Sequence, residues 1–156
     1  MSSMKLTVAW ILREFYIFLG FSWRDLSATI VPASIFTVGA MRSSNLSFPL
    51  LVSSYTLLFS WLISYVYFFN ISNQITGLEE DRVNKPDRPI PSGMVTMEGA
   101  KLRWILALAA FLGVAVYEPI LFPETICWVI TAGFLSLTSA GNHWLGKNCI
   151  ALTIGT

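Results

Sequence analysis

The sequence predicts an all-helical protein that crosses a lipid bilayer several times. Apolar residues make up 54% of the chain and charged residues 12%, whereas a soluble domain has roughly 25% charged residues. Long uncharged runs separate the charges, and no charged residue occurs from Ser43 to Leu78. A soluble helical core is the alternative, but these runs lack the polar stripe that a surface helix of a soluble protein carries.

Four stretches are candidate membrane spans, because about 18 or more apolar residues without charge are long enough to cross a bilayer. Residues 48–69 and 125–146 have the full length. Residues 26–41 are free of charge but short, and residues 104–117 are extended only weakly beyond their end. Residues 149–156 are apolar again. We therefore expect four spans and the start of a fifth.

The first 24 residues are predicted to be a cytosolic or interfacial segment that precedes a transmembrane region at 25–156. The segment is apolar but is interrupted by Arg13 and Glu14, so it lacks the unbroken apolar core of a secretory signal. An interfacial helix with aromatic side chains at headgroup depth fits this pattern. The aromatic residues are Trp10, Phe15, Tyr16 and Trp23.

The distribution of basic residues predicts the orientation in the membrane. Four spans would place the N-terminal segment, residues 79–103 and Lys147 on one side, and these hold nine of the ten Lys and Arg residues. Arg42 alone falls on the other side. Because cytoplasmic loops carry the excess of Lys and Arg, we expect a multi-pass protein whose N-terminus and 79–103 loop face the cytosol.

The loop after the second long span concentrates charge. Seven of the ten residues from Glu79 to Arg88 are charged, and three prolines follow at positions 86, 89 and 91. Helical structure is predicted to continue to about Asn84, because Pro86 disfavours the helical conformation for the residue before it. The loop is therefore expected to be stiff.

Helical geometry predicts a polar strip where the span meets this loop. Asn73 and Glu80 are seven residues apart, as are Gln74 and Asp81, so each pair differs by about 20° in direction. Gly77 lies between them without a side chain. The strip is rich in oxygen atoms. A solvated loop whose charges merely mark the membrane surface is the alternative interpretation.

Carboxylate and amide oxygens suit Mg²⁺, which proteins usually hold with one or two carboxylates together with substrate phosphates. We expect the metal ligands to be Asn73, Glu80 and Asp81. Basic side chains beside them suit phosphate oxygens. A metal, a diphosphate and an apolar span together suggest an isoprenoid diphosphate in the bilayer, and no nucleic-acid partner. The expected diphosphate-binding residues are Arg82, Asn84, Lys85 and Arg88.

Residues 73–93 resemble the first aspartate-rich motif of the UbiA superfamily of intramembrane prenyltransferases. Asn73 and Asp81 match the first and last positions of the Asn-Asp-x-x-Asp-x-x-x-Asp pattern, and Asn84-Lys85-Pro86-Asp87-Arg88-Pro89 with Pro91-Ser92-Gly93 match the run that follows. Lys147-Asn148 resembles the start of the family's fifth span. The chain thus resembles the first half of the UbiA fold.

Two departures from the family pattern stand out. Gln74 and Gly77 occupy positions where the family has aspartates, and Glu80 is the candidate to supply the missing carboxylate. The chain also lacks the family's second aspartate-rich motif. The resemblance therefore implies a truncated chain that is catalytically silent by itself.

The resemblance implies terpenoid chemistry: Mg²⁺-dependent ionisation of an isoprenoid diphosphate, with Asp81 and Arg88 as catalytic residues, and prenyl transfer to an aromatic or lipid acceptor. A UbiA-type membrane terpene cyclase is one alternative, and a non-catalytic truncated membrane protein is another. Tyr65, Tyr67, Phe68 and Phe69 are aromatic residues near the expected depth of the site. They are interpreted mainly as an interfacial belt, with cavity lining as the alternative.

The two cysteines, Cys127 and Cys149, lie in or beside predicted spans. They are expected to be small buried residues rather than disulfide or metal ligands.

Overall fold

The computed structural model describes residues 3–138, and every regular element in that range is a helix. Four helical segments are long and apolar enough to cross a membrane: Lys5–Arg42, Phe48–Thr76, Met97–Tyr117 and Pro119–Leu137. The prediction of an all-helical, multi-span protein is confirmed. The end of the fourth predicted span, the start of the fifth, Lys147-Asn148 and Cys149 lie outside the described residues.

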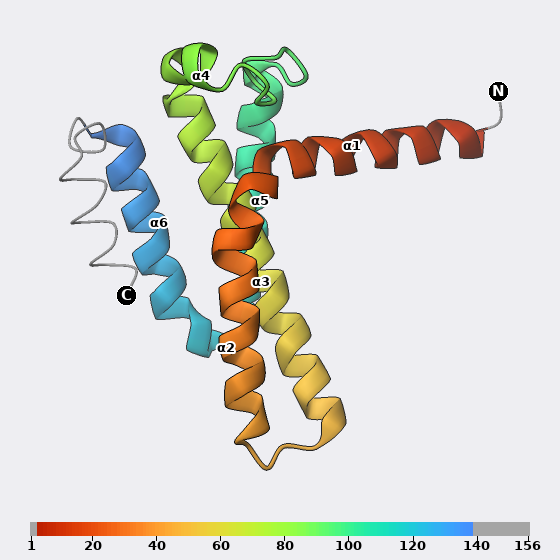
Figure 1. The fold of residues 1–156 in the computed structure, drawn as a ribbon, viewed down its shortest axis with the longest axis vertical. Coiled ribbons are helices and arrows are strands. Elements are labelled where there is room, and N and C mark those ends of the chain that lie inside the picture. Colours follow the sequence, from red (N-terminus) through yellow and green to blue (C-terminus); the bar gives the residue numbers. More distant parts are fainter. Residues whose placement is uncertain (1–2, 139–156) are drawn as a thin grey trace.

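The first candidate span has two parts that differ in direction. Helix α1 (Ser3–Asp25) runs at a large angle to α2 (Val31–Arg42), and the chain turns at the short π-helix η1 (Leu26–Ile30) between them (Figure 1). The boundary after residue 24 between an interfacial segment and a transmembrane region stays a prediction. Pro32, in the first turn of α2, has no N–H to continue the hydrogen-bond ladder from η1, which suits a change of direction here.

The long helix α3 (Phe48–Thr76) forms the centre of the molecule and packs most extensively against α5 (Met97–Tyr117). Small buried residues on α5, Ala100, Ala107 and Ala115, allow this close approach. The 3₁₀ turn η2 (Pro119–Leu121) leads into α6 (Phe122–Leu137), which diverges from α3 toward the end where α4 lies (Figure 1).

Hydrogen bonds between side chains join these helices. The Trp61 Nε1–H of α3 donates to Thr125 Oγ1 of α6 at 2.7 Å, and the Trp104 Nε1–H of α5 donates to Ser72 Oγ of α3 at 2.6 Å. Within a bilayer, helices associate through close packing and such interhelical hydrogen bonds, since lipid removes the hydrophobic drive between them.

Helix α3 is interrupted at Gly77 and continues as the short helix α4 (Leu78–Asn84). The predicted end near Asn84 is confirmed: Lys85, which precedes a proline, leaves the helical region with φ −145° and ψ 60°. Helix α5 begins at Met97, earlier than predicted, because Thr96 caps it. The Gly99 N–H donates to Thr96 Oγ1 at 3.1 Å.

Helix α1 is held against the rest of the fold by two ion pairs. Arg103 of α5 donates to both carboxylate oxygens of Glu14 with its Nη2 at 2.7 Å, and Arg24 contacts Asp87 at 2.7 Å. The prediction of a buried Cys127 was wrong, because this residue lies on an exposed face of α6.

Candidate functional site

The loop after α4 folds back in tight turns. The Ser92 N–H donates to the Arg88 carbonyl at 3.0 Å, and the Val95 N–H donates to the Pro89 carbonyl at 3.0 Å. Gly93 has φ +76°, a conformation that residues with a side chain rarely adopt. These turns direct Arg88 back toward α3.

Arg88 forms a largely buried ion pair with Asp81. The Arg88 Nη1–H donates to Asp81 Oδ2 at 2.6 Å, and the two side chains are 17% and 5% exposed. A charge-assisted hydrogen bond in such surroundings is strong, and removing one partner would leave a buried charge uncompensated. The pair therefore fixes the position of the guanidinium group.

A polar cavity of about 150 Å³ lies beside Arg88. It is formed where the corner between α1 and η1 meets α3 and the loop. Residues far apart in the sequence thus share one small space. Its lining consists of Asp25, Thr29, Tyr65, Val66, Phe69, Asn70, Asn73 and Arg88.

Within residues 3–138, the Asn70 side chain has an unpaired polar atom in the wall region of this cavity. Asn70 is 7% exposed, and its Nδ2 is buried without a hydrogen-bond partner among the described residues. Most buried polar groups in proteins have a partner. Asn70 also lies beside Arg88 in the lining of the cavity.

The structure brings some of the predicted site residues together and separates others. Asn73 and Arg88 line the cavity, and Asp81 is joined to it through Arg88. Glu80 is exposed and is not part of the lining. The break at Gly77 explains this separation, since its φ of −92° and ψ of 18° end the regular rotation on which the predicted strip depends.

The remaining predicted residues lie on the outer side of the loop. Arg82 is exposed and pairs with Glu79 at 2.7 Å. Asn84 is exposed, and Lys85 is partly exposed. None of the three lines the polar cavity. The side chain of Gln74 is 2% exposed and also lies away from the cavity.

Sequence reasoning missed four residues of the cavity, and Asn70 and Asp25 are the two among them that carry an amide or a carboxylate. A signal existed for Asn70: it is an amide inside an uncharged span, three residues before Asn73, so the two share a helix face. Asp25 gave no comparable signal. It belongs to a different helix, and only the turn at η1 carries it to α3.

The four aromatic residues singled out in the sequence have different surroundings. Tyr65 and Phe69 line the polar cavity. The Tyr65 ring also lies 4.7 Å from the Trp128 ring and 5.7 Å from the Phe111 ring, measured between centroids. Tyr67 packs on Phe18 and Phe21 of α1, and Phe68 faces a second cavity.

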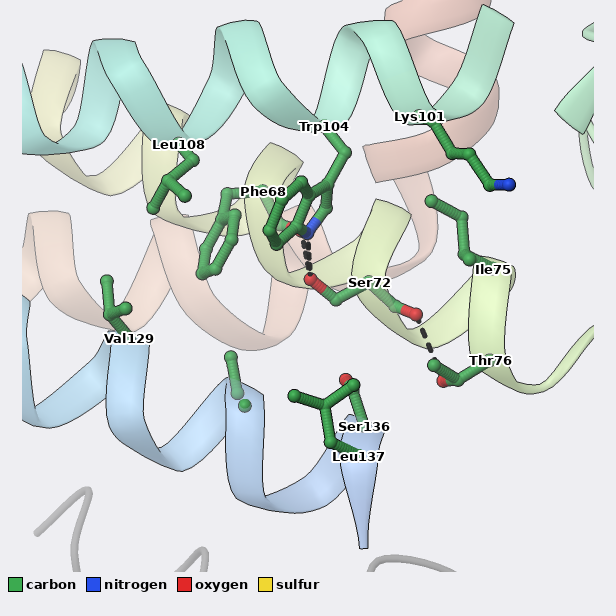
Figure 2. Close-up of a pocket in the computed structure, with 12 residues that line it drawn as sticks. Phe68, Ser72, Ile75, Thr76, Lys101, Trp104, Leu108, Val129, Ser136 and Leu137 are labelled. Atoms are coloured by element: carbon green, nitrogen blue, oxygen red, sulfur yellow. Dashed lines mark hydrogen bonds between the residues drawn. The ribbon is translucent and has the colours of Figure 1, made fainter. Parts of the chain in front are cut away.

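The second cavity is larger and mostly apolar. It measures about 330 Å³ and lies between α3, α5 and α6, with the Trp104 ring and Leu108 on one side and Val129 on the other (Figure 2). Lys101 and Ser136 provide polar groups at its lining. Its size is at the low end for small-molecule sites. It shares no lining residue with the polar cavity.

The donor set of the polar cavity suits a divalent cation together with a diphosphate. Within residues 3–138 no group of three or more His, Cys, Asp or Glu side chains is placed to hold a metal. Mg²⁺ needs fewer, because substrate phosphates and waters complete its shell. The carboxylate and amide oxygens of the cavity can supply the protein's share, and Arg88 and Asn70 can supply donors to the phosphate.

The family model described as UbiA prenyltransferase family matches residues 29–154 of the chain. Among individual relatives, a diterpene cyclase, eriG, and a polyprenyl transferase, eriF, both from Hericium erinaceus, are 61% and 57% identical over 146 and 147 residues. Each match covers 94% of the chain and 47% or 51% of the relative, respectively.

A somaliensene A/B synthase from Streptomyces somaliensis is 36% identical over 148 residues, which are 89% of the chain and 46% of that protein. The chain thus spans about half the length of these curated relatives. No solved structure matches it.

Proposed function

The chain belongs to the UbiA prenyltransferase family, and from this premise we propose that it carries the diphosphate-binding part of a membrane prenyltransferase. The substrate would be an isoprenoid diphosphate, and the prenyl group would pass to an aromatic or lipid acceptor. The observation that carries this proposal is the polar cavity, where Arg88 and the unpaired Asn70 amide lie beside an otherwise apolar helix bundle.

The reaction begins when the bond between the allylic carbon and the diphosphate oxygen breaks, and its electron pair leaves with the diphosphate. Arg88 donates to that oxygen-rich leaving group, and Asn70 donates a second hydrogen bond. Because both groups are already positioned before substrate arrives, they stabilise the developing charge without reorganisation. Asp81 acts through Arg88 by holding the guanidinium in place.

Magnesium, when bound, would supply additional neutralisation of the diphosphate charge. The oxygen atoms of the cavity lining are suited to hold it, and Asn73 contributes an amide. Asp81, the other expected ligand in this region, is engaged by Arg88.

The allylic cation left behind needs shelter from water and a stabilising surface. Aromatic faces attract cations, and Tyr65 and Phe69 line the cavity at its apolar side. The cation is then captured by a carbon of the acceptor, which afterwards loses a proton. The apolar cavity around Trp104 is available to a hydrocarbon group.

Terpene cyclisation is the second candidate, and a specific observation favours it. The chain is slightly more similar to the diterpene cyclase than to the polyprenyl transferase, and Gln74 and Gly77 replace two aspartates of the transferase pattern. In that case the cation would be captured by a double bond of its own chain, and no acceptor would be needed.

An exchange of matched segments distinguishes the two candidates. Residues 1–156 replace the matched segment in the Hericium cyclase and, separately, in the Hericium transferase. Each chimera receives Mg²⁺ with geranyl, farnesyl and geranylgeranyl diphosphates, with and without a hydroxybenzoic acid as aromatic acceptor. Diphosphate release that requires Arg88 supports the proposed function, and its product, prenylated or cyclic, identifies the reaction. No release in either chimera, with the unmodified relatives active, contradicts it.

The orientation is also proposed. Helix α1 would lie in the cytosolic interface, and the loop from 79 to 103 would face the cytosol. The fold supports this arrangement, because α1 projects sideways from the half of the bundle where α4 and the loop lie (Figure 1). Its exposed side carries large apolar and aromatic residues such as Trp10, Tyr16 and Trp23, as an interfacial helix requires.

A further inference from the structure

The polar cavity contains one acidic side chain, Asp25, among the eight residues that line it. Asp25 is the last residue of α1, and the turn η1 begins directly after it. Its carboxylate forms no hydrogen bond or ion pair with any residue in the range 3–138. An unpaired carboxylate in a small cavity beside an arginine calls for an explanation.

The corner between α1 and α2 is the feature that places Asp25. π-Helical turns are rare and occur frequently at functional sites. Here the turn lets α1 project sideways from the bundle while α2 runs alongside α3 (Figure 1). Thr29, which lies within the same turn, also lines the cavity.

The other carboxylates of the region are placed differently. Asp81 is 5% exposed in its side chain and is neutralised by Arg88. Glu79 pairs with Arg82 on the surface, and Glu80 is exposed away from the cavity. Gln74 and Gly77, at the positions where the family motif has aspartates, have no carboxylate.

We propose that Asp25 supplies the carboxylate that binds the divalent cation of the diphosphate, in the role that Gly77 and Glu80 do not fill. This inference rests on the proposed function. One carboxylate from the protein is sufficient for Mg²⁺ when substrate phosphates and waters complete its octahedral shell. Asn73 and Asn70, on the facing side of α3, provide neighbouring amides. The proposed metal site therefore joins α1, which carries Asp25, to α3, which carries Asn70 and Asn73.

A second observation supports a ligand here independently of Asp25. The Asn70 Nδ2 is buried and unpaired within the described part of the chain and belongs to the same lining. The cavity thus presents a carboxylate for a cation and a guanidinium for an anion, and Asn70 adds an amide to the lining. A metal–diphosphate pair satisfies both charged groups, whereas a lone anion would be repelled by Asp25.

The test measures metal binding without catalysis. The 156-residue chain, placed in lipid nanodiscs, is titrated with Mn²⁺ in the presence of inorganic diphosphate, and bound Mn²⁺ is followed by electron paramagnetic resonance. Asp25→Asn should weaken Mn²⁺ binding at least about tenfold, the lower end of the loss that second-shell mutations alone produce. Asp25→Glu should recover part of the affinity. Glu98→Gln, an exposed acid in the first turn of α5, is the control and should not change it.

Several outcomes would overturn the assignment. Unchanged Mn²⁺ affinity in Asp25→Asn, or a loss caused by Glu80→Gln instead, would show that the metal lies elsewhere. Tighter diphosphate binding in Asp25→Asn would show that the carboxylate only repels the anion. In each case, the proposed function would not be contradicted if diphosphate release by the chimeras still depended on Arg88. Absence of Mn²⁺ binding by the parent chain would overturn the assignment as well, and the chimeras would then decide the function separately.

Discussion

Gly20 of α1 lies against Pro89 of the charged loop, and a Cβ atom on residue 20 would come 2.9 Å from the Pro89 Cγ. Arg24, one turn later in α1, pairs with Asp87 at 2.7 Å. The residues on both sides of Arg88 are therefore held by α1. The N-terminal helix positions the loop that binds the diphosphate in the proposed function.

Gly20→Ala should shift the loop and weaken diphosphate binding, because the proline ring cannot move aside as a flexible side chain would. Gly39→Ala in α2 is the matched control, since a Cβ there would meet nothing within 4 Å. Without that clash, alanine in a helix is favoured over glycine by roughly 0.5–1 kcal/mol. Inorganic diphosphate affinity, measured by calorimetry in nanodiscs, should fall for Gly20→Ala alone. Equal affinities in the two variants would contradict the contact.

Arg88→Ala should destabilise the fold by about 3–5 kcal/mol, because the Asp81 carboxylate, 5% exposed, would lose its partner. Adding Asp81→Asn should restore much of this stability by removing the buried charge. Diphosphate binding should remain lost in the double variant, since Arg88 is the proposed contact of the anion. The midpoint of unfolding and the diphosphate affinity, measured together, separate these roles. Recovery of both would show that Arg88 is only structural.

Glu14→Gln should loosen α1 from α5. The carboxylate accepts hydrogen bonds from Arg103 Nη2 and Nε, with N···O distances of 2.7–3.1 Å, in partly buried surroundings. A hydrogen bond to a charged group contributes about 1.5–3 kcal/mol, so a loss of that order is expected in chemical unfolding. Glu98→Gln, at the exposed start of α5, should stay within about 0.5 kcal/mol of the parent. Similar losses for the two substitutions would contradict an anchoring role for Glu14.

Thr125→Val should destabilise the contact between α3 and α6 by about 1–3 kcal/mol, because the buried indole N–H of Trp61 would lose its acceptor. Thr131→Val is a close control. Both hydroxyls donate to the carbonyl four residues earlier in the chain, at 2.7 Å and 2.8 Å, but only Thr125 also accepts from α3. The difference in unfolding free energy between the variants measures the interhelical bond. No difference would show that the bond contributes nothing.

Single cysteines at Ser92 and at Pro123 should be labelled from opposite sides of the membrane, because α5 separates these two exposed positions. Cys127 and Cys149 are first replaced by alanine. A membrane-impermeant maleimide added to sealed, right-side-out vesicles should reach residue 123 and should reach residue 92 only after permeabilisation. Labelling of both residues before permeabilisation would contradict the proposed topology.

The sequence by itself determined the helical spans and the identity of the charged loop. A long uncharged apolar run is sufficient to predict a span, because backbone N–H and C=O groups in lipid must form their hydrogen bonds within the helix. Local rules also fixed the end of α4, where Pro86 excludes a helical Lys85. The motif from Asn84 to Gly93 could be matched to a family from the sequence alone, because its residues follow one another in the chain.

Tertiary structure decided which of these polar residues share a site. The expectation that Glu80 accompanies Asn73 assumed an unbroken helix, and the backbone at Gly77 ends that regularity. Asp25 reaches the cavity only because a π-helical turn redirects the chain between α1 and α2. Helical periodicity relates residues within one element, whereas a cavity between elements depends on how they pack, and packing has no local signature in the sequence.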